Sequence, residues 1–287
     1  MATSTPTIRS KWLGNALLKA RKEAGLTLDQ VSAQVGWQGS KISRVENGLV
    51  RVHWGDVQDL LDAYGIEDET QRKTLIALAK SLRERGWWRG YGATLSHPYA
   101  DFLSLEGTAR ELSVYQPQVI PGLLQTRGYA MAVVGSSHVW QSEEDVERFV
   151  EIRTARRSIL TRTSPVSLWA IVGEAALRQR LGGSNVLKEQ LNHLLEMAEL
   201  PSVTLQVLPF TAEGTTGMFG PFTILSFNAS GLMDVVFLEN LAGGLYLEQE
   251  DEINRYRLAY NHLRASALPP GRSLRLVKDV LKEITPP

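Results

Sequence analysis

The sequence has no cysteine and no apolar stretch near the roughly 20 residues that a membrane-spanning helix needs. Without cysteine, disulfide bonds, thiolate catalysis and thiol-based redox sensing are excluded. The first ten residues, Met1 to Ser10, lack the apolar core of a signal peptide, and we expect them to form a disordered arm. Together these features predict a cytoplasmic protein that does not associate with a membrane.

The chain also has no net charge, because its 31 Lys and Arg residues balance its 31 Asp and Glu residues. The distribution of charge says more about nucleic-acid binding than the sum does. Between Ile8 and Val52 there are eight basic and three acidic residues, so this segment carries 8 − 3 = +5. Such an excess is enough for a few phosphate contacts but not for a large basic groove. With 287 residues, the chain has room for about two domains.

Residue patterns typical of metal sites and enzyme active sites are missing as well. The five histidines show no metal-ligand spacing, and no nucleophile elbow or Ser/His/Asp pattern is present. Glu174 and Glu239 each lie at the end of an expected strand, which leaves an acid–base pair open. An arginine partner or a helix cap is the favoured interpretation of both. We therefore expect no metal, no cofactor and no enzyme activity.

Two polar segments allow both a structural and a functional interpretation. The loop EGTTGMFGP (residues 213–221) is rich in glycine but lacks the lysine and the spacing of a phosphate cradle. We expect a hairpin loop or a mobile flap there, with a ligand role less favoured. A basic cluster with glutamates one turn away favours a solvated, salt-bridged helix face over a second nucleic-acid site. The cluster consists of Arg153, Arg156, Arg157 and Arg162.

Helical patterns fill the first 85 residues. Apolar residues at helical spacing predict one helix from about Leu13 to Gly25 and two more over residues 54–64 and 68–85. Together with the two helices described next, they predict a five-helix domain over residues 11–85. Five short helices are enough to bury one small core.

Residues 26–48 have the pattern of two short amphipathic helices joined by a tight turn. Thr27 is a good N-cap for the first helix, and Gly36 stands where the chain must reverse, a position that commonly needs a left-handed backbone. The second helix turns only Ile42 and Val45 inward, so it presents its polar side outward. This pattern predicts a helix-turn-helix that reads DNA, with a plain helical hairpin as the less favoured alternative.

These residues, GLTLDQVSAQVGWQGSKISRVENG, resemble the lambda-repressor-like (XRE) helix-turn-helix domain, and the resemblance covers roughly residues 10–65. It implies that the helix after Gly36 enters the major groove with its N-terminal residues against base edges. The positions that the resemblance places against DNA are Gln38, Gly39, Ser40, Lys41 and Arg44.

The same resemblance implies roles for individual side chains. Gln38 is suited to adenine and Arg44 to guanine. Ser43 and Arg51 match positions that contact the DNA backbone, as do the amides at the start of the helix beginning at Leu28.

The resemblance also implies a structural pair, since Arg21 and Glu46 match a salt bridge that locks the first helix to the recognition helix.

Two residues of the motif are unusual for the family. Ser32 departs from the family pattern, in which a small alanine is usual, so its hydroxyl needs a local partner. Trp37 is large for a turn position, and contacts with a phosphate, a sugar or the domain itself all remain open.

Residues 86–97 (GWWRGYGATLSH) break the composition and predict a hinge before a second domain over residues 98–287. The two tryptophans of this segment, Trp87 and Trp88, are more readily explained by packing between the domains than by an exposed binding patch.

The second domain mixes helical and strand-like patterns. Expected helices cover residues 101–115, 123–134, a segment after Ser142, and residues 174–181, 184–200, 249–267 and 273–284. Strand-like runs cover residues 166–172, 203–208, 222–227, 234–238 and, more weakly, 245–247. Mostly hairpin-length connections between the last strands favour a mainly antiparallel sheet with helices around it. The expected fold class is therefore α+β, with an all-α first domain.

A second resemblance involves the segment YQPQVIPGLLQT (residues 115–126), in which the IPGLLQT string is the specific part. This segment looks like the uncharacterised C-terminal domain of many actinobacterial XRE regulators. The match extends to about residue 280 through Trp87-Trp88, Leu105-Glu106, Tyr129-Ala130, Glu174–Arg178, Gln190-Leu191 and Val207–Pro209. That family is similar to proteins encoded beside a small partner protein, in pairs that resemble toxin–antitoxin modules.

These patterns predict a sequence-specific transcription regulator whose C-terminal domain handles dimerisation and regulation. One small helix-turn-helix makes too few contacts for tight binding, so we expect a homodimer on a palindromic or pseudopalindromic site. The expected partners are double-stranded DNA, a second copy of the chain, and a small partner protein or small-molecule effector. The alternative is an antitoxin-like protein that mainly neutralises its small partner and binds DNA to regulate its own expression.

Overall fold

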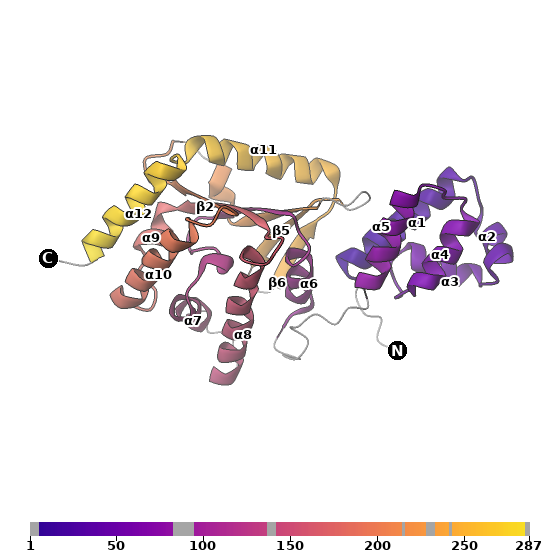
Figure 1. Ribbon diagram of the computed structural model, residues 1–287, viewed down its shortest axis with the longest axis horizontal. Coiled ribbons are helices and arrows are strands. Elements are labelled where there is room, and N and C mark those ends of the chain that lie inside the picture. Colours follow the sequence, from indigo (N-terminus) through magenta and orange to yellow (C-terminus); the bar gives the residue numbers. More distant parts are fainter. Residues whose placement is uncertain are drawn as a thin grey trace. The chain divides into compact units, whose positions relative to one another are not determined.

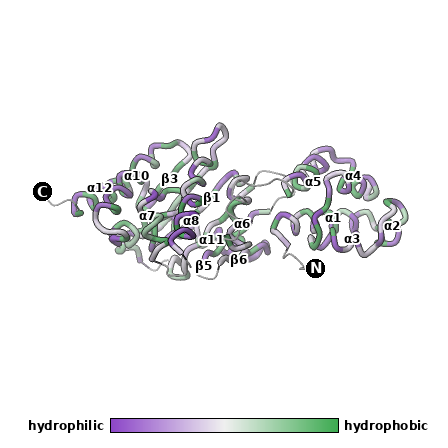
Figure 2. The backbone as a smooth tube through the Cα atoms, turned by 90° about the horizontal axis from the view of Figure 1, so that it is seen from below, coloured by the Kyte–Doolittle hydropathy of each residue, from purple (hydrophilic) through white to green (hydrophobic). Residues whose placement is uncertain are grey.

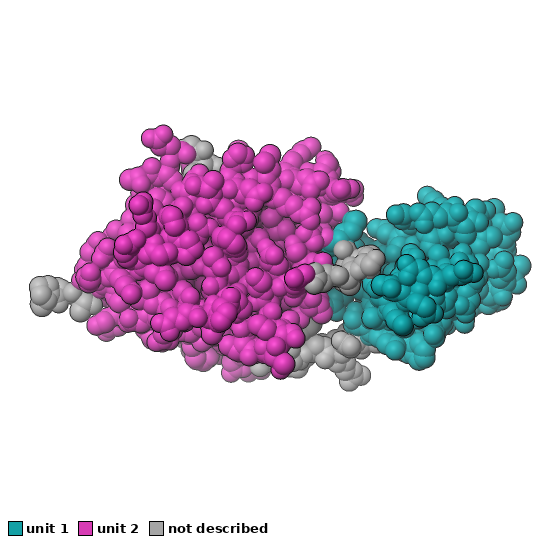
Figure 3. All heavy atoms as spheres, turned by 45° about the horizontal axis from the view of Figure 1, so that its top comes forward, with its two compact units in different colours: residues 1–87, 228–233 teal, residues 88–227, 234–287 magenta. Residues whose placement is uncertain are grey.

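The computed structural model describes residues 6–82, 95–136, 142–213, 216–227, 233–240 and 243–284. The chain divides into two compact units, shown in teal and magenta in Figure 3. The first contains residues 1–87 and the short segment 228–233, and the second contains residues 88–227 and 234–287. Each unit is described by itself below.

The first unit is the predicted five-helix domain (Figure 1). Its helices are α1 (Ile8–Glu23), α2 (Leu28–Val35), α3 (Gly39–Glu46), α4 (Trp54–Ala63) and α5 (Glu69–Ser81). Hydrophobic and hydrophilic residues alternate along these helices in Figure 2, because each helix has one buried and one solvent-facing side. The fully buried side chains include Leu17, Val31, Ile42, Leu60 and Leu61.

The prediction of a disordered arm over Met1 to Ser10 is wrong for its last three residues, which are helical. Helix α1 begins at Ile8, and the side chain of its N-cap, Thr7, accepts a hydrogen bond of 3.2 Å from the Ser10 amide. Ile8 is 3% exposed. A capping residue and a buried apolar side chain therefore start the helix before the apolar stripe used in the prediction. Residues 1–5 of the expected arm lie outside the described residues.

The second unit contains a sheet and its covering helices. Its strands are β1 (Glu111–Gln116), β2 (Ser167–Gly173), β3 (Val203–Leu208), β4 (Phe222–Ser226), β5 (Val235–Asn240) and β6 (Gly243–Leu247). Its helices are α6 (His97–Glu106), α7 (Arg127–Gly135), α8 (Glu143–Ala155), α9 (Glu174–Arg178), α10 (Ser184–Met197), α11 (Glu250–Ser266) and α12 (Pro270–Ile284). Short 3₁₀ turns are η2 (Gly122–Leu124), η3 (Arg156–Leu160) and η4 (Thr216–Phe219).

The six strands form one mixed sheet in the order β3-β2-β1-β4-β5-β6. Strand β1 pairs in parallel with β2, and β2 with β3, while the remaining three pairings are antiparallel. The predicted α+β class is confirmed. The parallel half arises because long segments containing α7 to α10 separate β1, β2 and β3, whereas short connections favour antiparallel neighbours.

Strand β1 corrects the prediction of a helix over residues 101–115. Helix α6 ends at Glu106, and the chain then forms a central strand with neighbours on both sides. Leu112 is fully buried and Val114 is nearly so. The segment ELSVYQ alternates polar and apolar residues up to Val114, a strand signal that the helical interpretation overlooked, and pairing with β2 and β4 completes the strand.

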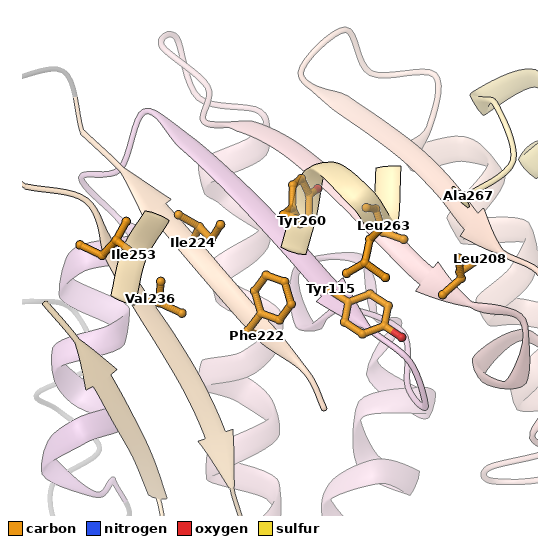
Figure 4. Packing of buried hydrophobic residues seen from close by; sticks show 10 residues of the cluster. Tyr115, Leu208, Phe222, Ile224, Val236, Ile253, Tyr260, Leu263 and Ala267 are labelled. Carbon is orange, nitrogen blue, oxygen red and sulfur yellow. The ribbon is translucent and has the colours of Figure 1, made fainter. Parts of the chain in front are cut away.

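Helix α11 covers one face of the sheet (Figure 1). Figure 4 shows Tyr115, Phe222 and Ile224 from the strands facing Tyr260 and Leu263 from this helix. The Tyr260 hydroxyl also donates a hydrogen bond of 2.6 Å to the Trp169 carbonyl oxygen, which fixes the helix over β2.

The opposite face carries α6, α7, α8 and α10 (Figure 1). Because side chains alternate along a strand, Leu112 and Val114 of β1 face this side while Tyr115 faces α11. The apolar side of α10 supplies Leu187, Leu191 and Leu194, all fully buried. This layer holds most of the charged groups discussed below.

The predicted hinge, residues 86–97, and its tryptophans Trp87 and Trp88 lie largely outside the described residues. Where the description resumes, Ser96 caps α6 by accepting a hydrogen bond of 3.4 Å from the Tyr99 amide. Within the described ranges, no helix has both the length and the apolar character to cross a membrane.

Candidate functional site

The first helix of the predicted motif, α2, begins and ends with strong local signals. The Thr27 hydroxyl accepts a hydrogen bond of 3.3 Å from the Gln30 amide, and the Gln30 side chain accepts one of 2.8 Å from the Thr27 amide. This reciprocal capping box satisfies two otherwise unpaired donors. At the other end Gly36 has φ +71°, a left-handed conformation that glycine adopts without steric cost.

The turn between α2 and α3 is closed by a side chain. Ser32, which departs from the family pattern, donates a hydrogen bond from its hydroxyl to the Trp37 carbonyl oxygen. The expected local partner of Ser32 is therefore the turn itself. Gln38 is extended at the N-cap of α3 and makes no side-chain cap.

Helix α3 separates its residues into two faces. Ile42, Val45 and Glu46 are at most 2% exposed. The candidate DNA-facing residues Gln38, Ser40, Lys41 and Arg44 are exposed, Gly39 and Ser43 are half-buried, and Arg51 is exposed in the following loop. An eight-residue helix with so small a buried face is positioned by its neighbours and leaves a polar surface for another molecule.

Lys41 is held by two contacts on this surface. Its ammonium lies 3.4 Å from the centroid of the Trp37 ring and 3.6 Å from an Asp56 carboxylate oxygen. Trp37 therefore packs against a lysine of α3, which is a contact with its own domain. Arg44 forms no ion pair with any residue that the structure describes. Its guanidinium is thus available to a ligand.

Asn47 and Ser43 form a small polar cluster at the end of α3. The Asn47 side chain donates a hydrogen bond of 2.7 Å to the Ser43 carbonyl oxygen and lies 3.4 Å from the Ser43 hydroxyl. This arrangement caps the last turn and leaves the Ser43 hydroxyl at the surface.

Arg21 and Glu46 form a bidentate ion pair beneath α3. Arg21 Nε and Nη2 donate to the two Glu46 oxygens at 2.8 and 2.9 Å, and Nη1 donates to the Leu26 carbonyl at 2.8 Å. The Tyr64 hydroxyl adds a third bond to Glu46, of 2.7 Å. The Glu46 hydrogen bond raises the pKa of Arg21, and burial followed by Glu46 raises the pKa of Tyr64. Glu46 thus joins α1, α3 and α4 and is unavailable to DNA.

Helices α1 and α3 make a close backbone contact that the sequence analysis did not predict. A Cβ at Gly14 would lie 2.6 Å from the Glu46 carbonyl oxygen and 2.7 Å from the Gly48 amide nitrogen. Gly48 has φ +68°, and a Cβ at this position would lie 2.8 Å from the Ser10 carbonyl oxygen. Glycine within a helical pattern is the signal that could have indicated this crossing.

In the second unit, the IPGLLQT string (residues 120–126) is anchored by buried amides. Gln125 donates to the Ile120 carbonyl at 2.7 Å. Gln190 of α10 donates to the Leu124 carbonyl and accepts from the Thr126 amide, both at 2.7 Å. Because Gln190 is fully buried, these bonds satisfy backbone groups that would otherwise be orphaned.

Two arginines beside this string are buried, so the prediction of a solvated arginine face is wrong for them. Arg153 and Arg156 are 8% and 7% exposed. Arg156 donates to both Glu106 oxygens at 2.7 and 2.6 Å and to the Tyr99 hydroxyl at 2.7 Å. Burial acts to lower the pKa of Arg156, but Glu106 and Tyr99 outweigh it and the pKa is raised.

Arg153 has fewer partners than Arg156. Its Nε donates to the Gln125 side-chain oxygen at 2.9 Å. Among the described residues, its two terminal nitrogens have no hydrogen-bond acceptor and no carboxylate lies within ion-pair distance. Arg157, in contrast, donates to the Gln125 carbonyl at 2.8 Å, and burial lowers its pKa.

Both buried arginines line a small cavity of about 30 Å³ beside the sheet. Its walls come from α6, η2, the end of α8, the start of η3 and the strands β1, β2, β4 and β5. The polar residues in its lining are Glu106, Gln116, Arg153, Arg156, Thr223 and Glu239.

The Glu174–Glu239 acid–base pair, the less favoured alternative, does not form. Glu174 accepts from Arg178 Nε at 2.8 Å and from the Phe210 amide at 2.9 Å, as the arginine-partner interpretation expected. Glu239 lines the cavity, whereas Glu174 is absent from its lining. No group of three or more His, Asp or Glu side chains in the described parts of the chain is placed to bind a metal ion.

The loop over residues 213–221 contains η4 and two strongly exposed apolar residues. Met218 is 87% and Phe219 is 92% exposed, and nearby in sequence Phe210 is 66% exposed. Gly217 is packed beneath them, with its carbonyl 3.3 Å from the Tyr115 hydroxyl that donates to it.

Comparison with known families covers both units. Residues 99–279 match the family described as "Domain of unknown function (DUF5753)", which is more than half of the chain. The chain belongs to this DUF5753 family. Residues 12–75 match the family model described as "Helix-turn-helix domain". No curated protein and no solved structure matches the chain.

The DUF5753 match spans the region from α6 to α12 and so includes the IPGLLQT string and the arginine-lined cavity. The helix-turn-helix match contains α2 and α3 with the capping box, the Gly36 turn and the exposed polar face. The chain is thus a helix-turn-helix protein with a DUF5753 domain, which points to a DNA-binding regulator.

Proposed function

We propose that this DUF5753 protein is a sequence-specific, dimeric transcription regulator that reads the major groove with α3. The observation that carries the proposal is the division of α3 into a buried face tied down by the Arg21–Glu46 pair and an exposed polar face. A recognition helix needs both features, because its reading side chains must be positioned within a fraction of an ångström.

The exposed residues are assigned roles by their chemistry. Gln38 pairs with adenine and Arg44 with guanine, each through two hydrogen bonds. Ser40 and Lys41 face the groove from the first turn of α3, and Gly39 allows close approach of the helix to the DNA. The assigned DNA-contacting residues are Gln38, Gly39, Ser40, Lys41, Ser43, Arg44 and Arg51.

Ser43 and Arg51 contact the DNA backbone in this proposal. Both are near the C-terminal side of α3, where the Asn47 cap leaves the Ser43 hydroxyl at the surface. Phosphate contacts fix the register of the protein on the duplex, while base contacts give specificity.

Dimerisation through the DUF5753 domain completes the proposal. A single helix-turn-helix makes few base contacts, and the segment from Ile8 to Val52 carries only a modest positive excess. Two copies on a two-fold site double the contacts. Sedimentation of the full chain tests the dimer. A protein that sediments as a monomer and still binds its selected DNA site tightly and specifically would contradict it.

Control of DNA binding is assigned to the DUF5753 domain, through a small partner protein or a small-molecule effector. The adjacent and strongly exposed side chains of Met218 and Phe219 support a protein partner, because contiguous exposed apolar surface marks interaction sites. The antitoxin-like alternative uses the same surface but makes partner binding the main role. Two measurements discriminate the regulator from the antitoxin-like protein. One is copurification with the product of a neighbouring gene, and the other is the effect of that product on DNA affinity.

The decisive experiment is selection of DNA bound by the full-length protein from a random pool. The proposal predicts an enriched motif with two half-sites related by a two-fold axis and spaced by about one helical turn. Enrichment of no sequence, with binding that depends only on salt, would contradict sequence-specific reading. The protein is expected to act in the cytoplasm and to need no cofactor or catalytic step.

A further inference from the structure

Two buried arginines of the same cavity differ in how their charges are balanced. Arg156 is matched by Glu106, with which it shares two hydrogen bonds of 2.6 and 2.7 Å. Arg153 is equally buried, but its one described partner is the neutral side chain of Gln125. A buried guanidinium without a counter-charge is costly, since desolvation is not offset by an ion pair.

The terminal nitrogens of Arg153 are accessible from the cavity rather than sealed in protein. Arg153 lines the cavity. Its terminal nitrogens have no described partner, and they are not fully enclosed, so they retain some accessible surface. Two donors of a guanidinium in a fixed fork match the two oxygens of one carboxylate. The structure thus presents an anion receptor that no described side chain fills.

Gly122 of the IPGLLQT string keeps this receptor open. A Cβ at this position would lie 3.2 Å from Arg156 Nη1, 3.4 Å from Arg153 Nε and 3.5 Å from Arg153 Nη2. The first approach is tighter than ordinary van der Waals contact, and the other two are ordinary contacts. A side chain at this position would therefore crowd the Arg156 guanidinium and occupy the space beside that of Arg153.

The remaining charges restrict the anion. Arg153 and Arg156 contribute two positive charges to the lining, and Glu106 and Glu239 two negative charges. Glu106 is engaged by Arg156, and Glu239 is an exposed residue, so its charge compensates the buried Arg153 only weakly. Since the charges of the lining sum to zero, a monoanion is accommodated better than a phosphate dianion. Glu239 has no ion-pair partner among the described residues and can accept a hydrogen bond from the ligand.

We infer that the cavity binds a small carboxylic acid, with the carboxylate on Arg153 and a hydroxyl or amino substituent donating to Glu239. The volume of about 30 Å³ fits this assignment. By this measure one water needs roughly 10–15 Å³, so the cavity admits a group of a few atoms and leaves the rest of a larger ligand outside.

A regulatory role for the acid rests on the proposed function, whereas its binding does not. The carboxylate would join Arg153 of α8 to the segment around Gly122, which Gln125 and Gln190 already anchor. Ligand binding would then stabilise one arrangement of the IPGLLQT string over others.

The test is ligand-observed NMR and calorimetry on the full-length protein without DNA. The probes are acetate, lactate and serine, compared with lactamide, which has the shape of lactate without the charge, and with inorganic phosphate. We expect saturable binding of lactate or serine at millimolar concentrations, weaker binding of acetate, and no binding of lactamide.

Variants assign the binding to the cavity. Arg153→Gln should weaken binding at least tenfold, and Gly122→Ala should weaken it while the guanidinium is retained. Arg148→Gln is the matched control, because Arg148 lies on the same helix, is exposed and pairs with Glu144. If Arg153→Gln fails to fold, Gly122→Ala carries the test alone.

The inference is overturned if none of the three acids binds, if phosphate binds more tightly than all of them, or if both cavity variants bind as the wild type does. A separate measurement of DNA affinity with and without lactate and serine tests the regulatory role. Unchanged DNA affinity would remove that role and leave the site, whereas absence of any specific DNA binding would instead remove the proposed function.

Discussion

Arg21 and Glu46 tie α1 to the last turn of α3 through two hydrogen bonds of 2.8 and 2.9 Å. Glu46 is 1% exposed and also accepts from the Tyr64 hydroxyl, so one carboxylate connects three helices. The exposed face of α3 depends on this buried connection, because the helix has only Ile42 and Val45 as its apolar anchors.

Glu46→Ala should therefore destabilise the first unit by about 3–5 kcal/mol, the usual cost of leaving one partner of a buried ion pair without the other. Hydrogen exchange measured by mass spectrometry resolves the first unit from the second and should show lost protection in α1, α3 and α4. Glu23→Ala is the control, since the Glu23 side chain is 62% exposed and pairs with Lys19. Unchanged exchange in α3 would show that the pair does not hold the helix.

Gly14→Ala should destabilise the same unit although alanine is the better helix former. The new Cβ would meet the Glu46 carbonyl oxygen at 2.6 Å, so α1 and α3 must separate. Overpacking of this kind costs about 1–3 kcal/mol, against a gain in helix propensity of about 1 kcal/mol. Gly39→Ala is the control for stability, because its Cβ would meet only Leu28 at an ordinary 3.8 Å. Equal denaturation midpoints for the two variants would contradict the close contact.

Arg44→Ala should weaken binding to the selected DNA site by about 1–3 kcal/mol and relax the preference at one base pair. The guanidinium is exposed and makes no ion pair in the described part of the chain, so it loses little on entering the groove. Fluorescence anisotropy on a set of single-base variants of the site measures both effects. Lys73→Ala, an exposed charge on α5, is the control, and unchanged base preference in Arg44→Ala would exclude a reading role.

Asp56→Asn should strengthen DNA binding several-fold by releasing Lys41. The Lys41 ammonium lies 3.6 Å from Asp56, and this contact competes with a DNA phosphate or base. If Lys41 meets a phosphate, Lys41→Ala should reduce the slope of log affinity against log salt by about one. Asp59→Asn on the same helix serves as the control. Equal affinity of the Asp56 and Asp59 variants would show that Asp56 does not restrain Lys41.

The stability of the second unit should fall as the pH drops below about 6.5. Burial and the nearby Arg157 lower the pKa of His193 from its ordinary value of 6.5. The unfolded chain then binds a proton at higher pH than the folded chain, so acidification favours unfolding until the folded-state pKa is passed. Urea unfolding at a series of pH values should show a smaller loss of stability in His193→Gln. His262→Gln, at an exposed position on α11, should retain the wild-type slope.

The sequence alone determined the helix-turn-helix, the α+β class and strands β2 to β6, because their signals are local. A capping box such as Thr27 with Gln30, a turn glycine such as Gly36 and an apolar stripe each act within a few residues. The Ser32 hydroxyl was likewise expected to need a nearby partner, and it has one in the Trp37 carbonyl.

Only the tertiary structure decided the features that depend on distant segments. The segment of β1 became a central strand because β2 and β4 pair with it on both sides, which its own alternation of polar and apolar residues allows. The buried state of Arg153 and Arg156 depends on Glu106, Tyr99 and Gln125, none of which is a sequence neighbour. Gly14 meets Glu46 across two helices. Contacts between segments so far apart in the chain leave no periodic signal, since burial and charge pairing arise only once the chain has folded.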